Sequence, residues 1–119
     1  MAHRKGRPSP IDLLEDEFAQ EKASALGRMG RALEAALAAL AAFDARERHE
    51  APAAGRGELR AALVTEASVA LWHFVVQREA CGLRDLRYVL RDYRVPAEVA
   101  ARMGALSDAP ARPRRRQPR

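Results

Sequence analysis

The sequence predicts an all-α fold, a long antiparallel helical hairpin followed by a short C-terminal two-helix hairpin. Apolar residues recur every three or four positions over residues 11–43 and again over residues 58–81, and alanine, the strongest helix former, fills many positions between them. A loop with one proline and two glycines, residues 49–57, separates these stretches. Helix-capping residues then mark two further short helices before residue 104.

The first predicted helix begins after Ser9 and continues to about Arg46. Ser9 suits the N-cap, Pro10 the first helical position, and Asp12 the acidic position of a capping box. If unbroken, this helix is about 55 Å long. Its apolar positions are Ile11, Leu14 and Phe18, followed at spacings of 3-4-3-4-3 by Leu26, Met29, Leu33, Ala36, Leu40 and Phe43, a short heptad pattern.

Two glycines, Gly27 and Gly30, interrupt this helix and allow two interpretations. They mark either a kink or a place where another helix approaches the backbone closely. The apolar pattern resumes directly after them, which favours the close approach.

The second predicted helix runs from about Glu58 to Cys81, with Gly82 as its left-handed C-cap residue and Leu83 as the apolar residue that follows. On a helical wheel it is apolar on two sides, which predicts neighbours on two sides. One arc holds Leu63, Ala67, Ala70, Leu71, Phe74, Val75 and Cys81, and the nearly opposite arc holds Val69, Trp72 and Val76. The first arc is predicted to face the first helix, and the second to face the C-terminal hairpin or a second copy of the protein.

Glu66, His73 and Gln77 form a polar stripe between the two arcs and are the strongest candidates for a chemical site. Their spacing places Glu66 or Gln77 where either one orients His73. A zinc site needs three or four ligands, and the chain contains neither an HExxH nor a CxxC motif. His73 and Cys81 are separated by eight residues along one helix, too far for a nucleophile pair. We therefore predict no catalytic residue, no metal, no cofactor and no enzymatic activity.

The two short helices are predicted at residues 86–93, capped by Asp85, and from Pro96 to Gly104. Together they have the outline of a helix-turn-helix, with Val95 in the turn and Val89, Tyr93 and Met103 at core positions. Leu90 and Arg94 fit that motif badly, since it prefers a small residue and a glycine there. Its second helix exposes mainly Ala97, Glu98 and Ala101, which offer little to base edges. A bundle cap whose solvated face carries Arg84, Arg87, Arg91 and Arg94 is the favoured interpretation.

Positive charge is concentrated at the two ends of the chain. Residues 1–8 and 109–119 carry three and five basic residues and no acidic ones, whereas residues 9–108 carry 13 basic and 16 acidic residues. Both ends are rich in arginine and proline and lack apolar periodicity, which predicts two disordered basic tails around one helical domain at residues 9–108. The C-terminal arginines, among them Arg114, Arg115 and Arg116, are able to bind nucleic acid weakly and without sequence preference, and equally able to contact acidic partners or lipid headgroups.

The chain is predicted to be cytoplasmic. It has a single cysteine and no secretory segment, and its longest apolar stretch, Val69–Val76, is interrupted by His73 and too short to span a bilayer.

Three stretches, "EKASALGRMGRALEAAL", "LWHFVVQREACGLRD" and "YRVPAEVAARMG", together resemble a family of short, uncharacterised bacterial helical proteins. The resemblance covers most of residues 11–104 and implies no activity, cofactor or binding residue. The favoured hypothesis is a non-enzymatic interaction or regulatory module that self-associates through Val69, Trp72 and Val76. The alternative is an accessory nucleic-acid-binding protein that uses its tails and the basic face of the C-terminal hairpin.

Overall fold

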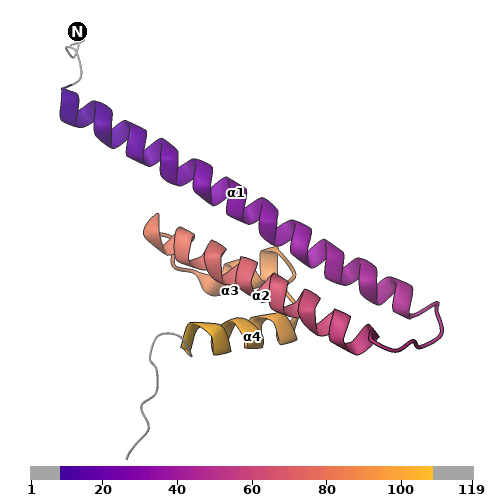
Figure 1. The fold of residues 1–119 in the computed structure, drawn as a ribbon. Helices are drawn as coiled ribbons and strands as arrows, with labels where there is room; N and C mark the ends of the chain where they lie inside the picture. Colours follow the sequence, from indigo (N-terminus) through magenta and orange to yellow (C-terminus); the bar gives the residue numbers. More distant parts are fainter. Residues whose placement is uncertain (1–8, 109–119) are drawn as a thin grey trace, which may run out of the picture.

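The computed structural model describes residues 9–108 and contains four helices, α1 (Pro10–Glu47), α2 (Arg56–Ala80), α3 (Leu86–Asp92) and α4 (Ala97–Asp108). Helices α1 and α2 form a long antiparallel hairpin, and α4 packs against the side of α2 that faces away from α1 (Figure 1). The predicted all-α class is confirmed. The predicted tails, residues 1–8 and 109–119, lie outside the described residues.

Helix α1 is one continuous helix of 38 residues. Its capping box is formed as predicted, because the Ser9 hydroxyl accepts from the Asp12 backbone N–H at 3.0 Å and the Asp12 carboxylate accepts from the Ser9 N–H at 3.4 Å. The helix passes through Gly27 and Gly30 without a break. The kink interpretation is therefore wrong, and the close approach is confirmed at one of the two glycines.

Gly30 is buried where α1 meets the rest of the molecule. A Cβ atom at this position would lie 3.2 Å from the Phe74 ring and 3.2 Å from the Tyr93 hydroxyl, tighter than an ordinary contact. The Phe74 and Tyr93 rings themselves pack edge to face, 5.2 Å apart. Gly27 has no such neighbour, since its Cβ would meet only the end of Arg31, at 3.5 Å.

Alanine substitutions at the two glycines should have different effects on stability. Gly27→Ala should raise the free energy of unfolding by about 0.5–1 kcal/mol, because alanine loses less backbone entropy than glycine in a helix. In Gly30→Ala the same gain in backbone entropy is opposed by the contact of the new methyl group with Phe74 and Tyr93. The free energy of unfolding of this variant should therefore be lower than that of Gly27→Ala by about 1 kcal/mol or more. Urea denaturation followed by circular dichroism measures both. Equal stabilisation by the two changes would contradict close packing at Gly30.

Helix α2 begins at Arg56, two residues earlier than predicted, after Gly55 takes a left-handed conformation with φ of 85°. Its C-terminus follows the prediction. Gly82 has φ of 85°, its N–H donates to the Glu79 carbonyl, and the Leu83 N–H donates to the Arg78 carbonyl at 2.8 Å. These two bonds form a Schellman motif, which satisfies carbonyls that the helix leaves without partners.

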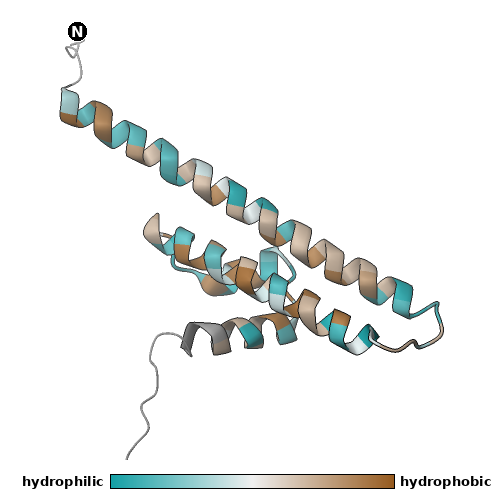
Figure 2. Cartoon of the chain, in the orientation of Figure 1, coloured by the Kyte–Doolittle hydropathy of each residue, from teal (hydrophilic) through white to brown (hydrophobic). Residues whose placement is uncertain are grey.

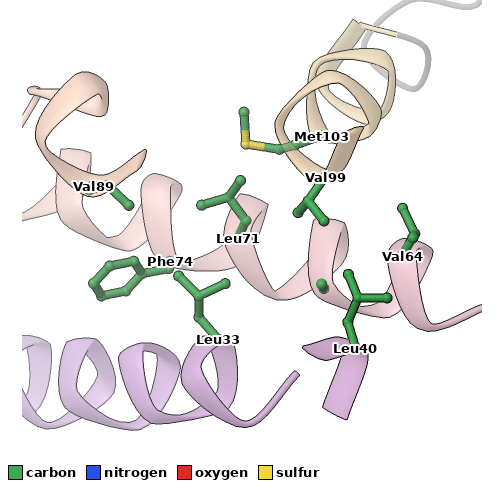
Figure 3. Close-up of a cluster of buried hydrophobic side chains, with 9 residues drawn as sticks. Leu33, Leu40, Val64, Leu71, Phe74, Val89, Val99 and Met103 are labelled. Carbon is green, nitrogen blue, oxygen red and sulfur yellow. The ribbon is translucent and has the colours of Figure 1, made fainter. Parts of the chain in front are cut away.

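The core is a single cluster to which all four helices contribute. Figure 3 shows Leu33 and Leu40 of α1 facing Phe74, Leu71 and Val64 of α2, while Val89, Val99 and Met103 approach α2 from α3 and α4. The predicted arc of α2 is confirmed as buried only at its centre, at Ala67, Leu71 and Phe74. Leu63, Ala70, Val75 and Cys81, also on that arc, are half-buried.

Two buried residues of α2, Val64 and Ser68, lie outside the predicted arc. Ser68 is fully buried, and its hydroxyl lies 2.8 Å from the Val64 carbonyl of its own helix and 3.1 Å from the Val99 carbonyl of α4. Because the serine side chain is small, α4 can approach α2 closely. The buried hydroxyl group of Ser68 has hydrogen-bond partners in the two carbonyl groups. The buried face of α2 is therefore rotated toward α4 relative to the predicted one.

Phe74 and His73 are neighbours in sequence that should differ in their importance for folding. Phe74 is 3% exposed, so Phe74→Ala should lower the free energy of unfolding by about 3–5 kcal/mol. His73 is exposed, so His73→Gln should change it by less than about 0.5 kcal/mol. The two variants are compared by urea denaturation. A larger loss for the histidine variant would show that the faces of α2 are assigned wrongly.

Helices α3 and α4 form the predicted C-terminal pair. The Asp85 carboxylate caps α3 by accepting from the Tyr88 N–H at 3.2 Å. Helix α4 follows Pro96 and continues to Asp108, past the predicted end at Gly104. The turn between them contains Arg94 with φ of 52°, and its bonds repeat the pattern found at Gly82, with the Val95 N–H donating to the Leu90 carbonyl.

Candidate interaction surface

The N-terminal part of α1 extends beyond the rest of the molecule. Helix α2 ends at Ala80, and the Gln77 side chain, near that end, donates to the Lys22 carbonyl of α1 at 3.5 Å. Every residue from Pro10 to Ser24 is exposed, and Figure 1 shows α1 continuing past the end of α2. Phe18 and Lys22 line a pocket together with Ala80 and Cys81 at that end. We call residues 10–24 the projecting segment.

Three large apolar side chains lie along one face of the projecting segment. Ile11, Leu14 and Phe18 are 67%, 51% and 61% exposed. Their spacing of three and four places them in one stripe, because a helix returns to the same face every 3.6 residues. Figure 2 shows hydrophobic residues in this part of α1 among hydrophilic ones. Monomeric proteins seldom leave large apolar patches in water, so this stripe is a candidate interaction surface.

A shallow groove runs between α1 and α2 and is lined mainly by small side chains. We call it the alanine groove; its walls include Ala32, Ala35, Ala36 and Ala39 of α1 and Val69 and Ala70 of α2. Ala32, Ala35 and Ala39 are exposed although they belong to the long helical hairpin. Alanine side chains allow another helix to approach the backbone closely.

The projecting segment and the groove share one face of α1. Positions 11, 14, 18, 21, 25, 28, 32, 35 and 39 follow the three-and-four spacing that keeps side chains on one side of a helix, and the charged Glu21 and Arg28 lie in the middle of this face. This face carries large apolar residues at its N-terminal end and alanines at its C-terminal end. Ile11, Leu14 and Phe18 are predicted from the sequence as apolar positions of the first helix but not as interface residues. The sequence feature that indicates their exposure is the length of the first helix, which is greater than the length of the second helix that packs against it.

The three predicted interface residues lie on α2 in different surroundings. Val69 lines the alanine groove, Trp72 is half-buried at the edge of the core with its ring 5.6 Å from the His73 ring, and Val76 is exposed. Of the three predicted interface residues, only Val69 is among those that line the alanine groove. Whether any of them contacts a partner stays a prediction.

The polar stripe of α2 is spread apart in the structure. Glu66 is exposed beside the alanine groove, His73 is exposed, and Gln77 reaches toward α1 rather than toward His73. Cys81 is half-buried at the end of the helix. Within residues 9–108, no three histidine, cysteine or acidic side chains gather as a metal site. The predicted lack of enzymatic activity stays a prediction.

Arg60 links three helices at the opposite end of the hairpin from the projecting segment. Its guanidinium binds the Asp44 carboxylate of α1 at 2.7 and 3.0 Å and the Glu98 carboxylate of α4 at 2.6 and 3.1 Å. The hydrogen bonds from Arg60 hold the pKa of Asp44 and the pKa of Glu98 below their ordinary values. A second arginine, Arg56, binds Glu47 at 2.6 Å and also binds Glu50, which closes the loop between α1 and α2.

This geometry gives the stability a defined dependence on pH. The native pKa values of Asp44 and Glu98 lie below the ordinary 3.8 and 4.5, so the unfolded chain binds protons at a higher pH than the native one. The ion pairs of Arg60 therefore contribute fully to the free energy of unfolding above about pH 5. This contribution is lost as pH falls through the native pKa values of Asp44 and Glu98.

Arg60→Gln should be less stable than the unchanged protein by about 1 kcal/mol at pH 7, since each exposed ion pair contributes a few tenths to one kcal/mol. The difference should shrink steadily below pH 4. Urea denaturation at several pH values measures it, with the exposed Arg87→Gln as a control for the loss of charge. A difference between the Arg60 variant and the unchanged protein that stays constant from pH 7 to pH 3 would contradict this assignment.

The four arginines of the predicted basic face, Arg84, Arg87, Arg91 and Arg94, are all exposed. Whether they contact nucleic acid stays a prediction. Arg94 adopts the left-handed conformation that a helix-turn-helix has at this position, although it is not a glycine. Helix α4, however, buries Val99 and Met103 against α2, and its Glu98 is bound to Arg60. Arg114, Arg115 and Arg116 lie outside the described residues.

With this geometry established, comparison with known proteins places the chain in a family. Its sequence matches a family of unknown function, DUF6665, over residues 7–112. The protein belongs to this family. The matched stretch includes all four described helices of this DUF6665 protein. The predicted resemblance to an uncharacterised family is therefore confirmed. No curated protein and no solved structure matches it. A bacterial origin stays a prediction.

One feature of this DUF6665 protein bears on membranes. Among the described residues, α2 alone is long and apolar enough to cross a bilayer by length and composition. The core helix of a helical bundle meets the same test, and α2 packs against both α1 and α4. One such helix is weak evidence for insertion, and the absence of a membrane span stays a prediction.

Proposed function

We propose that this protein is a non-catalytic helical interaction module that associates with a second copy of itself through the projecting segment of α1. The observation that carries the proposal is the stripe of Ile11, Leu14 and Phe18, exposed on a helix that continues past its intramolecular partner. Burying each of these side chains in an interface stabilises it by about 1.5–3 kcal/mol. A symmetric pair of copies buries the stripe twice.

The surroundings of the stripe support recognition of a protein surface. Two acidic residues, Glu15 and Glu17, flank it on either side, and Glu21 follows it on the same face. An apolar stripe with a charged border is the usual composition of a protein–protein interface, with its apolar centre and polar rim. The same acidic residues disfavour binding of the segment to nucleic acid, because they repel phosphate.

Accessory nucleic-acid binding remains the alternative. The exposed arginines of α3 and its flanking turns favour it, whereas the packing of α4 on α2 disfavours base recognition by that helix. The cytoplasmic location also stays a prediction.

The proposal is tested by replacing Leu14 with glutamate. Light scattering of the full chain at tens of micromolar should give a mass near twice 13.1 kDa, and Leu14→Glu should shift it to the monomer, because a charge cannot be buried in the interface without a large cost. Leu13→Glu is the matched control. Leu13 is also 51% exposed but points about 100° away from Leu14 around the helix, so this variant should remain associated.

Two outcomes would overturn the proposal. One is a monomer near 13.1 kDa at every concentration of the unchanged chain. The other is an equal effect of the Leu13 and Leu14 variants, which would mean that the stripe is not the contact. Circular dichroism checks that both variants keep their helical content.

A further inference from the structure

We propose that the two copies associate through their α1 helices, which lie antiparallel so that Ile11 and Leu14, at the start of each projecting segment, lie over the alanine groove of the other copy. This inference rests on the self-association proposed above and names the surface that receives the segment. Large apolar side chains of one copy would then fill the space over the alanines of its partner.

The start of the projecting segment matches the groove in register. The projecting segment covers residues 10–24, and α1 lines the groove over residues 32–39. In an antiparallel arrangement centred on residue 23, Ile11 lies opposite Ala35 and Leu14 opposite Ala32 of the second copy. This register places two of the three stripe residues, Ile11 and Leu14, against small side chains, the combination that packs helices without voids, and places Phe18 opposite Arg28.

Charge complementarity favours the same arrangement. The projecting segment carries five acidic residues and one lysine, and the next stretch of α1 carries the exposed Arg28 and Arg31. The antiparallel register brings Glu17 next to Arg31 of the second copy and Glu21 near Arg28. A parallel arrangement would place acidic segment against acidic segment and disfavour the pair.

The placement of both surfaces on one face of one helix indicates a second copy as the occupant. A two-fold axis near residue 23 satisfies the segment and the groove of both copies in a single contact. Such a two-fold contact forms a dimer and does not continue to larger assemblies, because the segment and the groove of both copies are occupied. Val69, which lines the groove from α2, would then touch the partner, whereas Trp72 would not take part directly.

Charge reversal tests the register. Glu17→Arg and Arg31→Glu should each raise the dissociation constant of the pair about tenfold at low salt, because each change replaces two attractions by two repulsions. Combining both changes in one chain should restore the constant to within about threefold of the original. Asp16→Arg is the matched control, since Asp16 carries the same charge on the outer face of α1 and should have a much smaller effect. Sedimentation equilibrium measures all four.

Cysteine cross-linking supplies an independent readout. In a Cys81→Ala background, a chain with both Leu14→Cys and Ala32→Cys should form a covalent dimer on mild oxidation. The two cysteines lie about 27 Å apart along one helix, so they cannot join within a single copy. Leu13→Cys combined with Ala32→Cys should cross-link poorly.

The outcomes separate this inference from the proposed function. A dimer that ignores the charge changes and does not cross-link through residues 14 and 32 would overturn the antiparallel arrangement and leave the self-association standing. A monomeric unchanged chain would overturn both. Rescue by the double charge reversal, together with cross-linking, would support both.

Discussion

Helix α2 has to pack against α1 and α4 at once, and the rest of the structure depends on how it does so. Ala67, Leu71 and Phe74 occupy the middle of its buried face, so the same residues close the contact with α1 and support the C-terminal hairpin. Ser68 makes the α4 side possible, because a larger side chain would separate the helices. Arg60 connects the same three helices at one end by charge. Helices α3 and α4 would have no core without this shared face.

The difference in length between the helices follows from the same arrangement. Helix α1 has 38 residues and α2 has 25, and α3 and α4 pack around α2 rather than beside the start of α1. The start of the projecting segment therefore extends past α2, whereas Phe18 and Lys22 border the end of α2. The helix of the projecting segment is held by the capping box at Ser9, by good helix-forming residues and by continuity with the packed part of α1, so it can present side chains in fixed positions. A fixed surface loses less entropy on binding than a disordered one.

Local signals predicted more of this structure than long-range ones. Ser9, Gly82 and Asp85 were assigned correctly as caps because each bond they make spans only a few residues. The burial of Val64 and Ser68 was missed because a helical wheel shows which faces are apolar but not from which direction α4 arrives. Ser68 is polar, and only the Val99 carbonyl of α4 explains its burial. The candidate site was missed for a similar reason, since the exposure of Ile11, Leu14 and Phe18 depends on where α2 ends beside α1.

The alanines of α1 have two roles that sequence alone does not separate. In a helix of a monomer, an exposed alanine simply favours the helical state. Ala32, Ala35 and Ala39 do this, yet they also line a groove beside Val69 and lie on the face that carries the exposed stripe. Large exposed apolar residues do not favour the helix more than alanine does, so helix stability does not explain Ile11, Leu14 and Phe18. The proposed contact with a second copy would explain them, and the small side chains on the same helix face would supply the space that this contact needs.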